Sequence, residues 1–518
     1  VDKKWQKIEI QREKEVPVRR SAVSARYWRK HLEKTEAEKI LREKLGSAEK
    51  ILVGIGSEWK KKEGAEEEEI LHAAEQLKKF LDGKDYYMIT SLADEDAKRL
   101  PFDAGHIAVP HSVSFTEENW KSNLTMAVAF EGDYDLEKAK ESAARERTEE
   151  EKREDARNRC FGTFLDDDET ICGVVNSREY LCRFDGGTYK LGGVGGVSTL
   201  PQYRRGGVIR ACMTASLKDM YANDFTFAFL YPFSMQYYRK FGFEAGAPEY
   251  RWSVPFTAMK PQDVGGHVEQ IFPGGDFTQL LTVYNAFYAD HNLSAVRETY
   301  DKGLEKANLW NDKRYIFVWY NNENQPRGLM ITHKIEEDGV TYLDCTHTFQ
   351  SPGGFLACDA EAFNGLLFFA KSAFSSDYEK LRFTVPSDMH LEQLIGENTR
   401  TFCSVFPNGM LRVVNVERVL ENCACRGTGE ITLRIEDDII TENNGTWRLH
   451  FAPGEQNEVE KIDAVPDLIL NIRAFSALIT GARAAADIPW MPDVRLLRQA
   501  SAVPNVFYPK KCSMMDLF

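Results

Sequence analysis

The feature that most constrains this chain is a glycine-rich stretch at residues 192–207, which runs directly into an amphipathic helix pattern. The stretch reads Gly192-Gly-Val-Gly-Gly-Val-Ser-Thr-Leu-Pro-Gln-Tyr-Arg-Arg-Gly-Gly207. The pattern predicts a strand, a short turn and then a helix over residues 208–221. The apolar residues of that helix would share one face, as packing against a sheet requires; they are Ile209, Met213, Leu217 and Met220.

The turn before this helix has the chemistry of an anion site. Gly206 and Gly207 let the backbone come close to a ligand, and the first N–H groups of a helix have no partner within it. The positive end of the helix dipole also favours a negative group there. Arg204 and Arg205 add charge-assisted donors at the rim. We therefore expect a pyrophosphate-binding turn; the alternative is a glycine-rich turn with a purely structural role.

A second informative block follows at residues 225–243. Residues 225–231 are a nearly continuous apolar run, which predicts a buried strand. Pro232 and Ser234 then open a short helix that ends at Phe241, with Gly242 as its stop.

These two blocks resemble the catalytic domain of GNAT acetyltransferases. Arg204-x-x-Gly207-x-Ile209 is similar to the acetyl-CoA motif R/Q-x-x-G-x-G/A, except for the isoleucine in its last position. That departure, the doubled arginine and the block from Leu230 to Phe243 resemble the enhanced-intracellular-survival (Eis) branch of the superfamily. The resemblance implies acetyl-CoA as co-substrate. It assigns the pantetheine arm and thioester to backbone groups of Val197 and Thr199, and the pyrophosphate to Arg204, Arg205, Gly206 and Gly207.

The same resemblance implies an acid and a base. Collapse of the tetrahedral intermediate expels a thiolate that must be protonated, and the implied acid is Tyr238, three residues before Phe241. Tyr237 beside it is the alternative, although we expect ordinary packing there. The attacking amine must lose a proton, because its pKa is about 10. The implied base is the carboxylate at Phe518, and the alternative is a terminus without function.

A chain of 518 residues is expected to hold several domains. The fold class we expect is α/β with mixed (α+β) sheets: tandem GNAT-like domains followed by a sterol-carrier-like α+β domain. Residues 445–449 and 466–470 carry the sterol-carrier resemblance. The expected boundaries are an N-terminal extension at 1–115, a catalytic GNAT domain at 116–258, a second GNAT-like domain without a coenzyme motif at 259–406, and the sterol-carrier-like domain at 407–518.

The N-terminal extension is rich in Lys, Glu and Arg, which predicts exposed helices. Strand patterns at 50–56 and 86–90 flank a helix pattern at 70–81, so we expect a βαβ-like unit. This piece resembles the start of a sirtuin-like nucleotide-binding domain, but it lacks a complete GxGxxG, so NAD chemistry is not implied. A charged helix over 136–159 and separate strands at 170–175 and 180–184 are expected next. Farther along the chain, we expect strands at 315–320 and 445–451 and helices over 360–374 and 474–486.

Charge and cysteine content exclude several function classes. A formal charge of -14 argues against general nucleic-acid binding and favours cationic partners, unless the acidity serves solubility alone. Cysteines offer a CxC at Cys423 and Cys425 but no CxxC, and His106 and His111 are isolated, so no metal is expected. We find no secretory signal and no membrane span, and expect reduced cysteines in a cytoplasm.

The leading prediction is an N-acetyltransferase with a broad amine acceptor. The Eis resemblance implies aminoglycosides, lysine side chains or polyamines as acceptors, and a homo-oligomer, a hexamer by that resemblance. The rival function is a lipid-binding or scaffolding protein, in which the sterol-carrier-like domain acts and the GNAT core is vestigial. The rival function is disfavoured because the motif residues are intact: Arg204, Gly207 and Tyr238.

Overall fold

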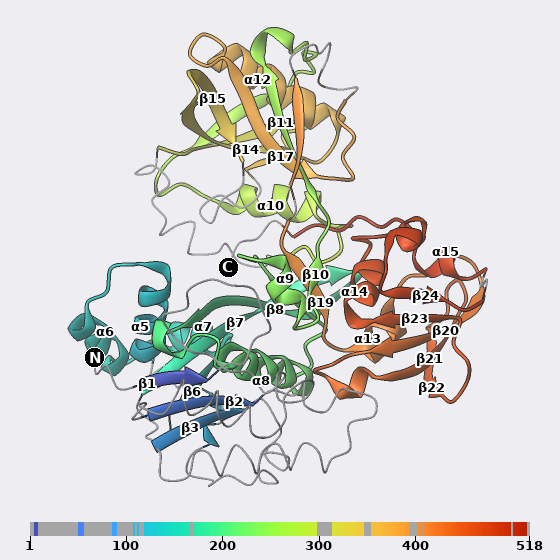
Figure 1. Ribbon diagram of the computed structural model, residues 1–518. Coiled ribbons are helices and arrows are strands. Elements are labelled where there is room, and N and C mark those ends of the chain that lie inside the picture. Colours follow the sequence, from blue (N-terminus) through green and yellow to red (C-terminus); the bar gives the residue numbers. More distant parts are fainter. Residues whose placement is uncertain are drawn as a thin grey trace. The chain divides into compact units, whose positions relative to one another are not determined.

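Two compact units make up the chain in its computed structural model (Figure 1). One contains Val1–Arg178 and Val194–Asn223, and the other contains Glu179–Gly193 and Asp224–Phe518. The structure describes five short strands near the N-terminus and residues 119–165, 170–297, 313–346, 354–392, 395, 401–406, 408–498 and 501–514.

The first unit begins with a parallel sheet in the order β1-β2-β3-β4. The parallel pairing of β2 with β3 is the pairing that a βαβ unit requires, as the strand patterns predicted. The expected helix at 70–81, and His106, lie outside the described residues. The strands are β1 Trp5–Ile8, β2 Lys50–Ile55, β3 Asp85–Thr90 and β4 Ile107–Ala108.

Three helices follow in the same unit: α5 Asn119–Phe130, α6 Leu136–Ala144 and α7 Glu149–Ala156. The single helix expected over 136–159 is wrong, because the chain turns between α6 and α7. Thr148 caps α7: the Glu151 amide donates to its hydroxyl, and the Glu151 carboxylate accepts from the Thr148 amide at 2.9 Å. This capping box starts a new helix inside the charged run.

The next sheet has the strand order β10-β19-β9-β8-β7-β6-β5, and the division between the units falls within β7 and β8. The two strands expected at 170–175 and 180–184 are one long strand that begins at Ile171, because Asn176, Ser177 and Arg178 continue the pairing with β6. The helix expected at 208–221 is confirmed as α8. The bounds are β5 His111–Ser112, β6 Asn158–Phe164, β7 Ile171–Phe184, β8 Gly187–Thr199, the 3-10 helix η3 Pro201–Tyr203 and α8 Val208–Ala222.

In the second unit, β9 Phe227–Leu230 pairs antiparallel with β19 Met410–Val413, a strand from much later in the chain. β10 Glu244–Ala245 pairs with the other edge of β19. The short helix α9 Met235–Arg239 lies between β9 and β10. Because β19 lies between them, the segment that follows Phe406 completes the sheet begun by the predicted catalytic domain.

A second sheet of this unit has the order β12-β13-β14-β15-β17-β11-β18, with β16 also paired to β14. Alternate residues of β13 enter two different cores, one with Trp319 beside α12 and one with Val318 beside α10. The bounds are β11 Glu249–Pro255, η4 Phe256–Ala258, β12 His267–Ile271, α10 Thr278–Phe287, β13 Tyr315–Tyr320, β14 Pro326–Glu337, β15 Val340–Cys345, β16 Phe355–Ala357, α12 Ala360–Phe374, β17 Lys380–Pro386 and β18 Phe402–Phe406.

The last sheet has the order β22-β21-β20-β23-β24 (Figure 1). Its helix α14 ends at Gly481, whose φ of 90° is the left-handed conformation that stops a helix, so the helix expected to reach residue 486 is six residues shorter at that end. The bounds are α13 Val416–Asn422, β20 Gly429–Glu436, η5 Thr441–Asn443, β21 Gly445–Phe451, β22 Glu458–Ile462, β23 Leu468–Asn471, α14 Ile472–Thr480, η6 Ala485–Trp490, β24 Val494–Leu496 and α15 Val503–Val506.

One core joins this last sheet to β9 and β19. It includes Phe229 of β9, Leu411 of β19, Leu433 of β20 and Phe475 of α14.

Among the described residues, no helix is long and apolar enough to cross a membrane.

A buried ion pair lies within the same region. Arg412 of β19 and Asp437, just after β20, both have fully buried side chains. The Arg412 Nη2 atom donates to both carboxylate oxygens of Asp437, at 2.8 and 2.7 Å. Asp437 also accepts from the amides of Ile439 and Ile440, so its charge is fully engaged. Such a pair ties β19 to the C-terminal sheet, because neither charge can be left alone inside a protein.

Replacing Arg412 by Met should therefore lower the free energy of unfolding by about 3–5 kcal/mol, because Asp437 would stay buried without its countercharge. The measurement is chemical denaturation of wild type and variant. The matched control is Arg418→Met, which breaks the exposed ion pair of Arg418 with Asp224. That loss should be below about 1 kcal/mol. Equal losses in the two variants would contradict the role given to burial.

Candidate functional site

The predicted anion turn is built from the end of β8 and the start of α8, in the first unit. Arg205 and Gly207 both have positive φ, 64° and 84°, so the backbone turns sharply twice in three residues. Gly207 is the N-cap residue of α8, and no side chain caps the helix. Ala211 makes the first helical bond, to the Gly207 carbonyl, so the amides of Val208 and Ile209 have no helical acceptor.

Electrostatics at this turn also favour an anion. Arg204 and Arg205 are exposed beside the turn, and the first turn of α8 holds no acidic residue. The Arg204 Nε atom lies 3.5 Å from the Thr199 carbonyl, which orients the guanidinium over the loop. Free amides and the helix dipole, with two exposed arginines in the same turn, therefore favour an anion here.

The strands beneath hold the turn in place. A Cβ atom at Gly173 of β7 would come within 2.7 Å of the Ser198 carbonyl oxygen and of a Val208 methyl group, so only glycine allows this close approach. Farther along α8, the Thr163 hydroxyl and the Cys212 sulfur lie 3.0 Å apart. α8 is thus fixed on the sheet by close packing.

In the second unit, helix α12 begins differently. Its N-cap is Asp359, whose Oδ1 atom accepts from the Ala362 amide at 2.8 Å. A carboxylate already occupies the position where an anion would bind. The start of α12 therefore differs from the uncapped start of α8.

Tyr238 lies on α9, in the second unit. Ser234 caps this helix by accepting from the Tyr237 amide at 3.4 Å. Tyr238 is buried within an aromatic cluster, with ring centroids of Phe233, Tyr237 and Phe243 between 5.3 and 6.5 Å away. Tyr237 is only half-buried. Among the described residues, no group hydrogen-bonds the Tyr238 hydroxyl.

Burial raises the pKa of the Tyr238 phenol above its ordinary value, and the neighbouring Tyr237 raises it further. The phenol is therefore fully protonated at neutral pH. A protonated hydroxyl that no described group hydrogen-bonds is suited to donate a proton to a bound molecule.

The end of α9 is held by Arg412. Its Nη1 atom donates to the Phe241 carbonyl at 2.7 Å. Gly242 follows with a φ of 80°, and a Cβ atom there would lie only 1.5 Å from the same Nη1 atom. Position 242 must therefore be glycine, because any larger residue would displace the Arg412 guanidinium, which holds the end of the helix that carries Tyr238.

Phe518 lies outside the described residues, but the chain that leads to it is held firmly up to Met514. The Met514 carbonyl accepts from the Tyr231 hydroxyl at 3.0 Å and from the Asn408 side-chain amide at 2.6 Å. Lys510 forms a buried ion pair with Asp185, N to O 2.5 Å. The C-terminal tail, defined as residues 508–514, is therefore anchored beside the end of β9.

Sequence reasoning missed three residues of this region. Arg412 and Asn408 act through partners far away in sequence, and no local pattern marks them. Glu249 of β11 is buried, and burial raises the pKa of its carboxyl to about 8, although Arg251 opposes the shift. A lone glutamate at the start of an apolar strand was the available signal. Such a carboxyl could take up a proton near neutral pH.

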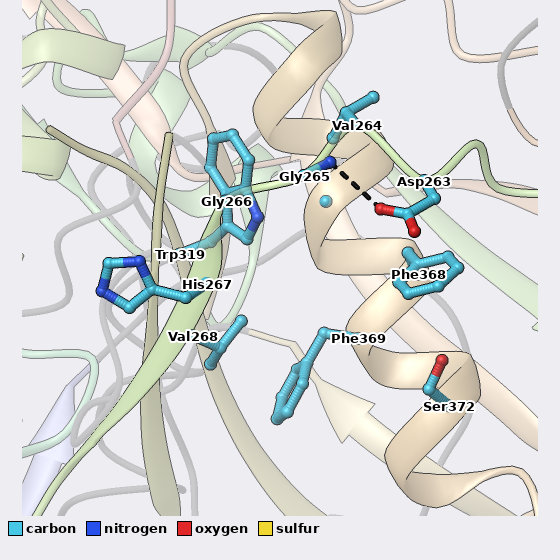
Figure 2. A pocket seen from close by; sticks show the side chains of 11 residues that line it. Asp263, Val264, Gly265, Gly266, His267, Val268, Trp319, Phe368, Phe369 and Ser372 are labelled. Atoms are coloured by element: carbon cyan, nitrogen blue, oxygen red, sulfur yellow. Dashed lines mark hydrogen bonds between the residues drawn. The ribbon is translucent and has the colours of Figure 1, made fainter. Parts of the chain in front are cut away.

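A separate cavity of about 270 Å³ lies between α12 and the β12–β13 edge of the second sheet. Figure 2 shows Trp319 and Phe369 among the side chains that line it, and the Gly265 amide donating to Asp263 at 3.0 Å. None of the predicted site residues lines this cavity. Among the described residues, no three His, Cys, Asp or Glu side chains gather as metal ligands would.

Two family models match parts of the chain. Residues 120–246 match an acetyltransferase (GNAT) domain, and residues 416–511 match a sterol carrier protein domain. No curated protein sequence matches the chain.

Solved structures show the same fold. A probable N-acyltransferase from Enterococcus faecalis has a TM-score of 0.64 at 18% identity, and a GCN5-related N-acetyltransferase from Anabaena variabilis has the same two values. Eis1 from Mycobacterium abscessus has a TM-score of 0.63 at 15% identity. Each match covers 79% of this chain and 100% of the other. The expected fold class is confirmed: mixed α/β sheets with a GNAT domain and a C-terminal sterol carrier domain.

The backbone of the anion turn can be tested with Gly207→Ala. The variant should weaken binding of coenzyme A about tenfold, because a left-handed N-cap costs an alanine roughly 1–2 kcal/mol and the methyl group faces the ligand. Titration calorimetry measures the affinity. Gly274→Ala is the matched control, since Gly274 also has a positive φ of 77° and open space at its Cβ. An equal loss of affinity in the control would show that strain alone, and not the anion turn, is responsible.

Proposed function

We propose that this chain, an acyltransferase by its GNAT domain, transfers the acetyl group of acetyl-CoA to an amine, as an enzyme of the enhanced-intracellular-survival type. The observation that carries the proposal is the uncapped start of α8, with positive φ at Arg205 and Gly207 and two exposed arginines. In the proposal Arg204, Arg205, Gly206 and Gly207 hold the pyrophosphate. Backbone groups of Val197 and Thr199 hold the pantetheine arm and thioester.

The proposed reaction is direct transfer. The neutral amine attacks the thioester carbonyl carbon, and the tetrahedral intermediate expels the coenzyme A thiolate. Tyr238 gives its proton to that thiolate, which its protonated and otherwise unengaged hydroxyl supports. The base that takes the proton of the amine is the carboxylate at Phe518.

The acceptor we propose is a cationic amine: an aminoglycoside, a lysine side chain or a polyamine. The formal charge of -14 supports attraction of cations to the protein. We further propose a homo-oligomer, a hexamer, in the cytoplasm, without nucleic-acid or metal partners. Light scattering of the purified protein would give the mass of the assembly.

The alternative function is lipid binding or scaffolding through the C-terminal domain, which the sterol carrier match at residues 416–511 supports. The two functions separate in one assay. Thiol release from acetyl-CoA with a panel of amines supports acetyl transfer, whereas failure to bind acetyl-CoA at all would favour the lipid-binding alternative.

Tyr238→Phe should lower kcat for thiol release by about 100-fold or more, because the leaving thiolate loses its proton donor. Binding of acetyl-CoA should be unchanged, since the ring and its packing stay. Tyr237→Phe is the matched control and should keep most of the activity. A larger loss in Tyr237→Phe than in Tyr238→Phe would exchange the roles of the two tyrosines.

Extending the chain beyond Phe518 by one alanine moves the carboxylate, and should lower kcat by about 100-fold or more at neutral pH with little change in acetyl-CoA binding. Part of the loss should return at high pH, where more of the amine is already neutral. Glu249→Gln is the comparison variant. If it abolishes turnover while the extension does not, the base is Glu249 and the role given to Phe518 is wrong.

A further inference from the structure

Cys423 and Cys425 place two sulfur atoms side by side. Their Sγ atoms are 3.8 Å apart, with only Ala424 between the two residues. Cys423 is buried and Cys425 is half-buried, so Cys425 is the more exposed residue of the pair. Three other contacts involve the sulfurs: Cys423 Sγ with the Leu420 carbonyl at 3.3 Å, the Asn457 side-chain amide donating to Cys423 Sγ at 3.5 Å, and Cys425 Sγ with the Cys423 carbonyl at 3.8 Å.

The CxC loop, residues 423–425, is part of the anchor of the C-terminal tail. The Ala424 amide donates to Asp185 Oδ2 at 2.8 Å, and Lys510 Nζ donates to the same oxygen at 2.5 Å. One carboxylate oxygen thus joins the loop to the tail. The Asn457 side chain fixes the start of the loop by donating to the Cys423 carbonyl at 2.8 Å.

The surroundings favour one thiolate. A hydrogen bond from the Cys423 thiol lowers the pKa of the Cys425 thiol, and the positive charge of Lys510 assists the shift. Burial and the negative charge of Asp185 oppose it. Hydrogen bonding to Cys425 and burial raise the pKa of the Cys423 thiol. The more exposed sulfur is therefore the nucleophile, and the buried sulfur keeps its proton.

We propose that Cys423 and Cys425 are a redox-active dithiol, which a hydroperoxide oxidises to a disulfide, and that closure of this disulfide releases the C-terminal tail from Asp185. In a reducing compartment such a disulfide is transient and serves as a sensor.

The chemistry balances with the hydroperoxide as oxidant. The Cys425 thiolate attacks the peroxide, so an S–O bond forms and the O–O bond breaks; the leaving oxygen takes up a proton and departs as water from hydrogen peroxide, or as an alcohol from an organic hydroperoxide. The Cys423 sulfur then attacks the sulfenic acid. The S–S bond forms, the S–O bond breaks, and the Cys423 proton leaves with the hydroxide as water. The two sulfurs lose two electrons and the peroxide gains them. A small thiol reverses the step by exchange.

Closure must move the loop. A disulfide is about 2.0 Å long, so the sulfurs approach by almost half of their present separation. Because a single residue separates the cysteines, the Ala424 amide turns with them and leaves Asp185 Oδ2. Asp185 Oδ1 still accepts from the Asn292 side-chain amide at 2.9 Å, but Oδ2, which Lys510 contacts, loses its second donor, so the hold of Asp185 on the tail weakens. Any effect of the disulfide on turnover rests on the function proposed above, in which the tail carries the Phe518 carboxylate. Formation of the disulfide does not depend on that function.

The experiment uses the full chain as Cys403→Ser, which removes an exposed cysteine, treated with hydrogen peroxide and digested with trypsin. Peptide Val419–Arg426 contains both cysteines and no other. It should become lighter by two hydrogen atoms, resist alkylation, and recover with a thiol. In parallel, hydrogen exchange of residues 508–514 should increase after oxidation and return on reduction. Turnover is measured last, on the same samples.

Two serine variants sharpen the test. Cys423→Ser should stop at a sulfenic acid that a dimedone probe captures on Cys425, whereas Cys425→Ser should react with the probe far less. A peptide that keeps two alkylatable thiols after oxidation, or is over-oxidised without the cross-link, would overturn the proposal. A disulfide that leaves the exchange of residues 508–514 unchanged would overturn its link to the tail. Both readouts are independent of acetyl transfer, so they decide even if the proposed enzyme function fails.

Discussion

The second unit depends on one buried ion pair, Arg412 with Asp437. Arg412 holds the Phe241 carbonyl at the end of the helix that carries Tyr238, and Asp437 holds Arg412 from the C-terminal sheet. Two opposite charges without solvent must stay together, since separating them leaves one uncompensated in a medium of low dielectric constant. The candidate acid and the sterol carrier domain are therefore linked through a strand, β19, that neither family match includes. This explains physically why the C-terminal domain accompanies the catalytic one in a single core.

A second set of polar contacts holds the C-terminal tail in position. Asp185, at the end of β7, accepts from Lys510 of the tail and from Ala424 of the CxC loop. Tyr231 and Asn408 meet at the Met514 carbonyl. Each of these groups accepts hydrogen bonds from donors that are far apart in the sequence. The tail is thus placed by specific hydrogen bonds as well as by apolar burial, which makes its position sensitive to small changes at any of these groups.

Much of the local structure could be predicted from periodicity and turn chemistry. The helix at 208–221, the strands at 315–320 and 445–451 and the helix at 360–374 all agree with their patterns, because each is specified by residues within one element. The helix predictions were wrong where a capping contact began or ended a helix inside a continuous sequence pattern. Thr148 and Glu151 started a new helix inside a charged run, and Gly481 ended α14 before the alanine-rich stretch. Residue composition does not reveal such contacts, because each depends on a single side chain.

The sequence by itself determined the anion turn: its glycines, arginines and following helix lie within twenty residues, and their conformations follow from steric freedom and helix geometry. The resemblance to GNAT acetyltransferases indicated Tyr238, three residues before Phe241. Only the tertiary structure decided why Gly242 must be glycine, which carboxylate accompanies Arg412, and that Cys423 and Cys425 lie against Asp185 and Lys510. The physical reason is that a buried polar group must find a partner, and folding chooses that partner from any part of the chain.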